Sequence, residues 1–160
     1  MSNEIKKGLL GIVVDETTIS QVVPELSALT YRGYKVQDLC DKCDFEEVAY
    51  LVLHGELPSK KQLKKFIQEE RSHRKLSNQI IKDIKRMPRN AHPMDVIRTC
   101  VSLMALEDKD TKDNSPKANM RKTMKIFAKT PTAVAAYFRA RKGKQIISPN
   151  KKLSFSENFF

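Results

Sequence analysis

Three histidines are the side chains best suited to general acid–base chemistry, because an ordinary imidazole titrates near neutral pH. They are His54, His73 and His92, and none has a carboxylate or a nucleophile at a spacing that would complete a catalytic pair. His54 precedes Gly55 at the expected end of one helix, where the helix dipole favours a cation. His92 precedes Pro93, where it is placed to cap another helix. We therefore expect no catalytic residue among them.

Two arginines near the end of an expected helix, Arg71 and Arg74, could bind an anion. A guanidinium suits this task because its fork of N–H donors matches a carboxylate. The alternative is a pair of surface charges that complement the helix dipole. Further along, the basic run at 139–144, together with Lys151 and Lys152, could bind phosphate or simply form a solvated helix end.

Cys40 and Cys43 form a C-x-x-C motif, and Cys100 is the third cysteine. A redox-active C-x-x-C pair normally lies where a strand meets the start of a helix, whereas this pair falls in the gap before an expected helix. A zinc site would need two further ligands at similar spacing, and the sequence supplies none. We therefore expect two small structural side chains and no metal site.

The charge is distributed unevenly along the 160 residues, which carry 30 Lys and Arg against 19 Asp and Glu. Residues 1–58 hold 5 basic and 10 acidic residues (net −5), so residues 59–160 hold 25 and 9 (net +16). A basic half of this kind could bind nucleic acid or another polyanion, or it could be a solvated surface with no partner. The lysines follow helix-surface periodicity and no aromatic platform accompanies them, so we expect no nucleic-acid partner.

The hydropathy pattern indicates a cytoplasmic protein, because no apolar run approaches the ~20 residues that a membrane helix needs. Residues 8–34 are typical of short strands, with a hairpin expected over 12–19, a break at 22–24 and an extended run over 29–33. Helical periodicity and capping signals then predict helices over 44–55, 59–74, 77–87, 93–104 and 115–142. Pro131 is expected to kink or split the last helix, and residues 143–157 are expected to be irregular.

These elements predict a mainly α fold with a small N-terminal β ribbon. The expected division is a β ribbon over 1–36 and a helical segment over 37–160. No hydrolytic triad, P-loop, dinucleotide fingerprint or zinc constellation is present in the sequence. Residue types and spacing alone therefore do not identify a reaction.

Four segments together resemble the N-terminal part of the citrate synthase family. They are KGLLGIVVDET at 7–17, LTYRGY at 29–34, FEEVAYLVLHGELP at 45–58 and AHPMDVIRT at 91–99. The run VVPE at 22–25, the segment 29–34 and the long helix over 120–141 are most similar to the bacterial 2-methylcitrate synthase branch.

The resemblance implies a helical segment of the large domain of an all-α, two-domain homodimer. Such an enzyme condenses propionyl-CoA or acetyl-CoA with oxaloacetate, giving 2-methylcitrate or citrate and free CoA. A carboxylate removes a proton next to the thioester, histidines stabilise the enol and assist at the ketone, and water then hydrolyses the thioester. No metal or separate cofactor is implied, since the CoA thioester is itself a substrate.

The resemblance does not imply an active site within these 160 residues. The family's catalytic histidines lie in motifs of the type G-P-x-H-G-G and G-x-G-H-P, and neither occurs here. We therefore expect the 160 residues alone to be inactive. One binding residue is carried over, because the stretch 68–74 resembles a helix end where the family can place a basic substrate contact. Arg71 is the predicted contact.

Two adjacent aromatic residues, Phe159 and Phe160, bury little at a terminus and so suggest that more chain follows. Apolar helix faces around 96–104 and 126–138 would then be left exposed, which predicts aggregation or a partly molten state. Two alternatives stay open: a separate subunit that pairs with a second, catalytic polypeptide, and a non-catalytic basic binding module.

Overall fold

The structure, a computed structural model, describes residues 8, 11–26 and 28–160. Parts of the segment 7–17, namely Lys7, Leu9 and Leu10, lie outside the described residues. The chain divides into two compact units, one ending at Pro58 and the other comprising Ser59–Phe160. Each unit is described by itself. Among the described residues, no helix has both the length and the apolar character needed to span a bilayer.

The first unit contains a three-stranded antiparallel ribbon in the order β1 (Ser20–Val23), β2 (Ala28–Tyr31) and β3 (Tyr34–Lys35). A short 3-10 helix, η2 (Pro24–Leu26), connects β1 to β2. The β2–β3 turn uses Arg32 and Gly33, which both have positive φ (49° and 86°). Two successive left-handed residues give a hairpin turn whose twist matches that of the strands.

The predicted hairpin over 12–19 is wrong, because residues 12–17 have no regular secondary structure. The first strand instead runs through Val22 and Val23, where a break was expected, and pairs Val22 with Leu29. Pro24 ends this strand rather than preventing it, since a proline is tolerated at a strand end. The Asp15-Glu16 dipeptide lacks the glycine that a tight two-residue turn favours.

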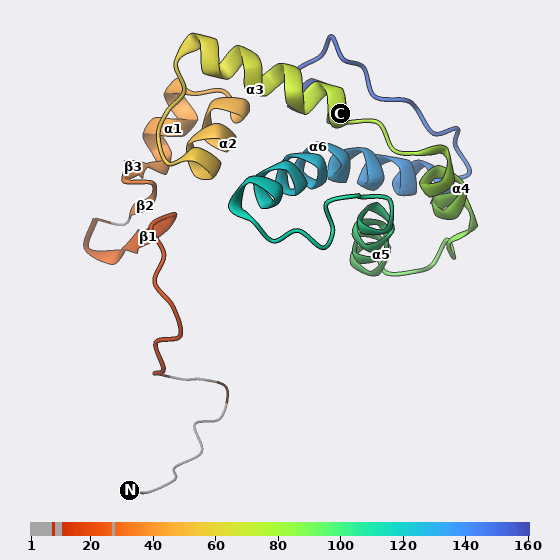
Figure 1. The fold of residues 1–160 in the computed structure, drawn as a ribbon, viewed down its shortest axis with the longest axis horizontal. Helices are drawn as coiled ribbons and strands as arrows, with labels where there is room; N and C mark the ends of the chain where they lie inside the picture. The colour runs from red at the N-terminus through yellow and green to blue at the C-terminus, as the bar shows by residue number, and fades with distance from the viewer. Residues whose placement is uncertain (1–7, 9–10, 27) are drawn as a thin grey trace, which may run out of the picture. The chain divides into compact units, whose positions relative to one another are not determined.

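Helices α1 (Val36–Lys42) and α2 (Phe45–His54) complete the first unit (Figure 1). Helix α2 begins with the predicted capping box of Asp44 and Glu47 and ends at Gly55, whose φ is 94°. Helix α1 was not predicted, and it contacts both β2 and β3. The compact unit that holds the ribbon therefore extends to Pro58.

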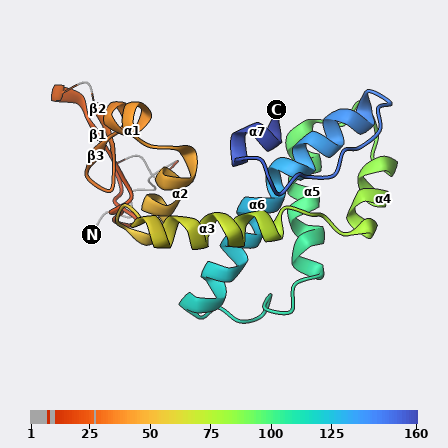
Figure 2. The same ribbon diagram turned by 90° about the horizontal axis from the view of Figure 1, so that it is seen from above.

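The second unit consists of α3 (Lys60–His73), α4 (Asn78–Arg86), α5 (Pro93–Leu106), α6 (Pro116–Arg141) and α7 (Phe155–Phe159). The other four helices all contact α6, which runs through the middle of this unit (Figures 1 and 2). The core lies where α4, α5 and α6 meet, and its buried members are Leu76, Ile80, Ile84, Val96, Cys100, Met104, Ala133, Ala136 and Tyr137.

The predicted helix starts are confirmed by their capping contacts. The hydroxyls of Ser59, Ser77 and Ser115 accept hydrogen bonds from the backbone of their own first turns. The His92 imidazole does the same for the N–H of Met94, at 3.3 Å. These bonds satisfy N–H groups that a helix cannot pair internally.

Helix α6 is continuous through Pro131, so the proline does not split it. The segment expected to be irregular over 143–157 contains the start of α7 at Phe155. Ser154 and Glu157 form a capping box that begins this short helix. The observed architecture confirms a mainly α fold with a small N-terminal β ribbon.

Candidate functional site

Arg71, the predicted substrate contact, lies in the last turn of α3 and is half-buried. Its Nε is buried and has no hydrogen-bond partner among the described residues. The nearby charge of Arg71 contributes to a lowered pKa of the Glu157 carboxyl, after the larger contribution of hydrogen bonds from Ser154. Arg71 is therefore a cation with an unused donor beside one carboxylate, which is compatible with anion binding.

Arg74, the second candidate, is buried rather than a surface charge. Its Nε and Nη2 donate to the two carboxylate oxygens of Glu70 at 2.7 and 2.6 Å. Its Nη1 donates to the carbonyl oxygens of Asn150 and Leu153, both at 3.0 Å. With its fork occupied by Glu70, Arg74 joins α3 to the segment before α7 and is a structural residue in this fold.

Glu70 and Arg74 form a buried pair that the sequence interpretation missed. The signal was available, because Phe66, Glu70 and Arg74 are spaced four residues apart and so share one face of α3. Phe66 marks that face as buried. Glu70 and Arg74 carry opposite charges on the helix face that holds the buried Phe66. Because burying an unpaired charge costs much free energy, this spacing indicates a buried ion pair.

Each of the three histidines lies at or next to a helix end. His92 caps α5 through Nδ1. The ring of His54 stacks on that of Tyr50 at the end of α2, with centroids 4.1 Å apart. His73 is half-buried in the last turn of α3. In the described part of the chain, no three His, Cys, Asp or Glu side chains come together as a metal site, and this includes the C-x-x-C motif.

Two of the basic residues near the end of α6, Arg139 and Arg141, make contacts within the second unit. Arg139 donates from Nε to the carbonyl oxygen of Gln145. The guanidinium of Arg141 lies over the ring of Tyr137 at 5.7 Å. Tyr137 in turn donates its hydroxyl proton to the carbonyls of Pro88 and Ala91. These contacts favour the interpretation of a helix end over that of a dedicated phosphate site.

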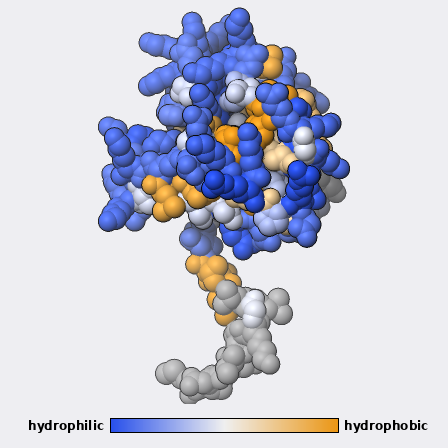
Figure 3. All heavy atoms as spheres, turned by 90° about the vertical axis from the view of Figure 1, so that its right-hand side faces the viewer, coloured by the Kyte–Doolittle hydropathy of each residue, from blue (hydrophilic) through white to orange (hydrophobic). Residues whose placement is uncertain are grey.

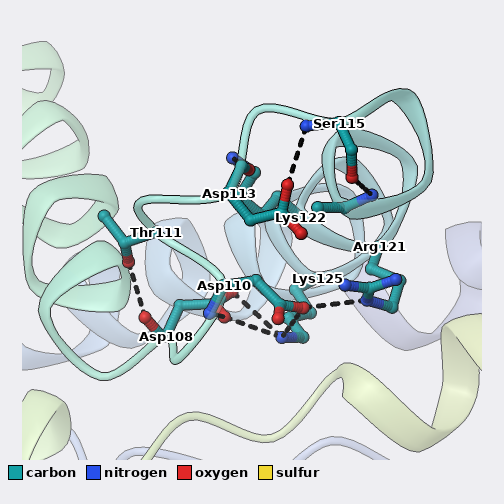
Figure 4. Close-up of polar contacts among 9 residues, drawn as sticks. Asp108, Asp110, Thr111, Asp113, Ser115, Arg121, Lys122 and Lys125 are labelled. Atoms are coloured by element: carbon teal, nitrogen blue, oxygen red, sulfur yellow. Dashed lines mark hydrogen bonds and ion pairs between the residues drawn. The ribbon is translucent and has the colours of Figure 1, made fainter.

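The charged loop between α5 and α6 is fixed to α6 by ion pairs (Figure 4). The Nζ of Lys125 lies 2.9 and 3.0 Å from the Asp108 carboxylate oxygens. Arg121 donates from Nε to Asp110 at 2.8 Å. The backbone N–H of Asp110 and the Lys125 ammonium lower the pKa of Asp108, and the Arg121 guanidinium lowers that of Asp110. Every carboxylate in this network has a partner, so the loop is not an open cation site.

The second unit contains a groove of about 670 Å³ between the C-terminal half of α6 and the segment 147–160. We call it the α6 groove. Its apolar lining includes Val134, Phe138, Ile147, Leu153, Phe159 and Phe160. The surface shown in Figure 3 is mostly hydrophilic, with hydrophobic side chains exposed in places. The groove is therefore suited to an apolar surface rather than to a small, highly charged ligand.

Thr132 lies in the lining of the α6 groove and was also missed from the sequence. Its side-chain hydroxyl is buried and has no hydrogen-bond partner among the described residues. A buried hydroxyl without a partner costs free energy, so such groups are rare in a finished interior. The only local signal was a threonine after Pro131, and nothing in the neighbouring residues indicated that its hydroxyl would be unpaired.

Comparisons with known proteins agree on one family. A family model described as "Citrate synthase, C-terminal domain" matches residues 8–160. A citrate synthase of Mycolicibacterium smegmatis is 47% identical over 155 residues, 97% of this chain and 41% of the relative. A 2-methylcitrate synthase of Mycobacterium tuberculosis is 46% identical over 156 residues, 98% of this chain and 39% of the relative.

The fold agrees with the same family. The crystal structure of citrate synthase from Pyrobaculum aerophilum superimposes with a TM-score of 0.89 at 29% identity, over 95% of this chain and 40% of that one. The chain thus spans about two fifths of the length of the curated relatives that it matches.

Proposed function

The chain belongs to the citrate synthase family, and from this premise we propose that it forms part of an enzyme that condenses an acyl-CoA with oxaloacetate. The reaction joins the carbon next to the thioester to the ketone carbon of oxaloacetate, and water then cleaves the thioester to release CoA. The observation that carries the proposal is the 46–47% identity to two synthases of this kind over nearly the whole chain.

The finer proposal is a 2-methylcitrate synthase, with propionyl-CoA as the acyl donor. Several 2-methylcitrate synthases, including one of Corynebacterium glutamicum at 43% identity, support this branch. A citrate synthase using acetyl-CoA is the second candidate, because the Mycolicibacterium smegmatis relative has the same level of identity. The two acyl groups differ by one methylene, which a pocket distinguishes by only ~1–3 kcal/mol.

The 160 residues alone are proposed to be inactive. The chain corresponds to about two fifths of the length of its relatives, and its histidines occupy structural positions at helix ends. We propose that the catalytic groups belong to the remaining family length. The complete enzyme is proposed to be a cytoplasmic homodimer without a metal or nucleic-acid partner.

Arg71 is proposed to contact the anionic substrate in the complete enzyme. Its half-buried guanidinium in the last turn of α3 supports this role, because a guanidinium binds a carboxylate through paired N–H donors. The nearby Glu157 opposes it in the isolated chain. Substitution Arg71→Lys in the complete enzyme should therefore raise KM for oxaloacetate more than it lowers kcat, because an ammonium keeps the charge but loses the fork.

A CoA-release assay tests the activity. The chain is produced alone and together with the part of the Mycolicibacterium smegmatis citrate synthase that it does not match, and free thiol is followed with oxaloacetate and each acyl-CoA. We expect no release from the chain alone and release from the pair, and release by the chain alone would refute the proposed inactivity. The native Mycolicibacterium smegmatis enzyme is the control for the acyl group: replacing its matched part by this chain should raise the ratio of kcat/KM for propionyl-CoA to that for acetyl-CoA, and an unchanged ratio would contradict the 2-methylcitrate synthase branch.

A further inference from the structure

We propose that Cys40 and Cys43 form an accessible dithiol that a low-molecular-weight disulfide, such as oxidised glutathione, converts into an intramolecular disulfide bond. This modification site lies in the first unit and takes no part in the proposed condensation. The proposal therefore stands or falls independently of the proposed function.

The structure removes the reason for setting the C-x-x-C motif aside. The pair was expected in a gap before a helix, but Cys40 lies in the last turn of α1 and Cys43 is the residue that ends that helix. The backbone N–H of Cys43 donates to the carbonyl oxygen of Leu39 at 3.0 Å, so the helical turn extends to Cys43. The two cysteines are therefore held one helical turn apart.

This spacing fits a disulfide bond. Residues three apart in an α-helix have Cα atoms about 5 Å from each other, because the chain rises about 4.5 Å and nearly completes a turn. Cysteines in disulfide bonds have Cα atoms roughly 4.4–6.8 Å apart. Cys43 has φ −125° and ψ 144°, so the chain leaves the helix there in an extended conformation. The bond can thus form without unwinding α1.

The two thiols differ in accessibility from the third cysteine. Cys40 is exposed and Cys43 is partly exposed, whereas Cys100 is 0% exposed in the core of the second unit. Within α1 the buried side chain is that of Leu39. A packing role, which the sequence suggested for the pair, does not explain an exposed Cys40. An external reagent can reach Cys40 and its neighbour Cys43 but not Cys100.

The charges around the pair disfavour a stable thiolate. Burial most of all, and then Glu47 and Asp44, raise the pKa of the Cys43 thiol against a smaller opposing effect of Lys42. The pair also lies at the C-terminal end of α1, where the helix dipole disfavours an anion. Dithiols that are strong oxidants have a stabilised reduced form. The opposite surroundings here indicate a disulfide that is comparatively hard to reduce.

The reaction consists of two thiol–disulfide exchanges. The Cys40 thiol loses its proton to water, and its thiolate attacks one sulfur of oxidised glutathione, which breaks that S–S bond and releases one glutathione thiolate. The Cys43 thiol loses its proton in the same way, and its thiolate attacks the Cys40 sulfur and releases the second glutathione. Each released thiolate takes up a proton. Two protein thiols are thus oxidised while one glutathione disulfide is reduced to two thiols.

The experiment measures the equilibrium constant for oxidation of the intact 160-residue chain in mixtures of reduced and oxidised glutathione. Free thiols are trapped with iodoacetamide, and peptide mass spectrometry identifies the alkylated and the bridged cysteines. We expect a disulfide between Cys40 and Cys43, with Cys100 still reduced and alkylated only after unfolding.

The matched control is the double variant Lys42→Cys/Cys43→Ser, which moves the second thiol back by one residue. Lys42 is exposed, so the substitution disturbs no buried contact. Residues two apart lie on different faces of a helix, and cysteines whose Cβ atoms point apart are not bridged without backbone movement. The equilibrium constant for oxidation should therefore be at least about tenfold lower in the control.

Urea separates the helical spacing from mere closeness in sequence. In unfolding concentrations of urea the natural pair should lose most of its advantage over the control, because α1 no longer fixes the spacing. Equal equilibrium constants for the two pairs without urea would overturn the proposal. So would a mixed disulfide that remains on Cys40, or a disulfide that joins two chains.

Hydrogen exchange gives a second readout. The Cys43 amide lies at the end of the loop that the disulfide closes and donates to the Leu39 carbonyl. Oxidation should slow its exchange at least about threefold, because the bond opposes opening of the last turn of α1. Exchange in α6 should not change. Unchanged exchange at Cys43 after complete oxidation would contradict the helical geometry assigned to the pair, whatever the result of the CoA-release assay.

Discussion

The buried pair Glu70–Arg74 gives the sharpest test of how the second unit is held together. Both side chains are almost wholly inaccessible, with 0% and 2% exposed, and they share two hydrogen bonds of 2.7 and 2.6 Å. Glu70→Gln leaves the guanidinium charge buried without a counter-charge. Breaking a buried pair in this way costs about 3–5 kcal/mol.

The double variant Glu70→Leu/Arg74→Leu should be far less costly than the sum of its single variants, Glu70→Leu and Arg74→Leu, each of which leaves one buried charge unpaired as Glu70→Gln does. It removes both buried charges, and replacing a buried ion pair with apolar side chains is often close to neutral. The remaining loss comes from the carbonyls of Asn150 and Leu153, each worth about 1 kcal/mol. We therefore expect a total loss of about 2 kcal/mol, against about 6–10 kcal/mol for the sum of the single losses.

Urea unfolding followed by circular dichroism at pH 7 measures these differences, with an osmolyte added to keep weak variants folded. Arg98→Gln is the matched control, because its pair with Asp95 is exposed and should contribute less than about 1 kcal/mol. Single losses below about 1 kcal/mol that add in the double variant would refute the role assigned to the pair.

Three further predictions concern other contacts. Folding lowers the pKa of Asp108. The carboxylate therefore contributes fully to the free energy of unfolding above its ordinary pKa near 3.9, and this contribution is lost as pH falls through the lower pKa of the folded state. Asp108→Asn should flatten the loss of stability below about pH 4 in an acid titration followed by circular dichroism. Gly55→Ala should lower the free energy of unfolding of the first unit by about 1 kcal/mol, because φ is 94° there, and an unchanged urea midpoint would contradict this. Arg32→Lys should speed hydrogen exchange in β1 and β2, because the Arg32 fork holds the Val52 carbonyl and Thr18; unchanged exchange would mean that the ribbon is held elsewhere.

The helix starts of the second unit could be predicted because their signals are local. A serine or a histidine before a periodic apolar run supplies an acceptor for the first turn, and this contact spans only two or three residues. Helix α1 was missed because its N-cap, Lys35, makes no side-chain capping bond and the helix has only seven residues. Strand register was harder still, since β1 pairs with a strand that begins beyond a 3-10 helix.

The candidate site was less predictable than the fold. Arg74 and Glu70 share a helical stripe with Phe66, so their burial was visible in the spacing, but the carbonyls of Asn150 and Leu153 are 76 and 79 residues away from Arg74. The α6 groove combines one long helix with a later segment that contains the short helix α7 and packs back against α6. Contacts of that kind depend on tertiary packing, which periodicity does not describe.

The central place of α6 has a consequence for synthesis on the ribosome. Helices α3, α4 and α5 are made before α6, yet each of them packs against it. At about 5–20 residues per second, on the order of several seconds separate the emergence of α3 from that of the end of α6. During that interval the apolar faces of the earlier helices have no partner from α6. The nascent chain is therefore expected to need protection by chaperones until α6 leaves the tunnel.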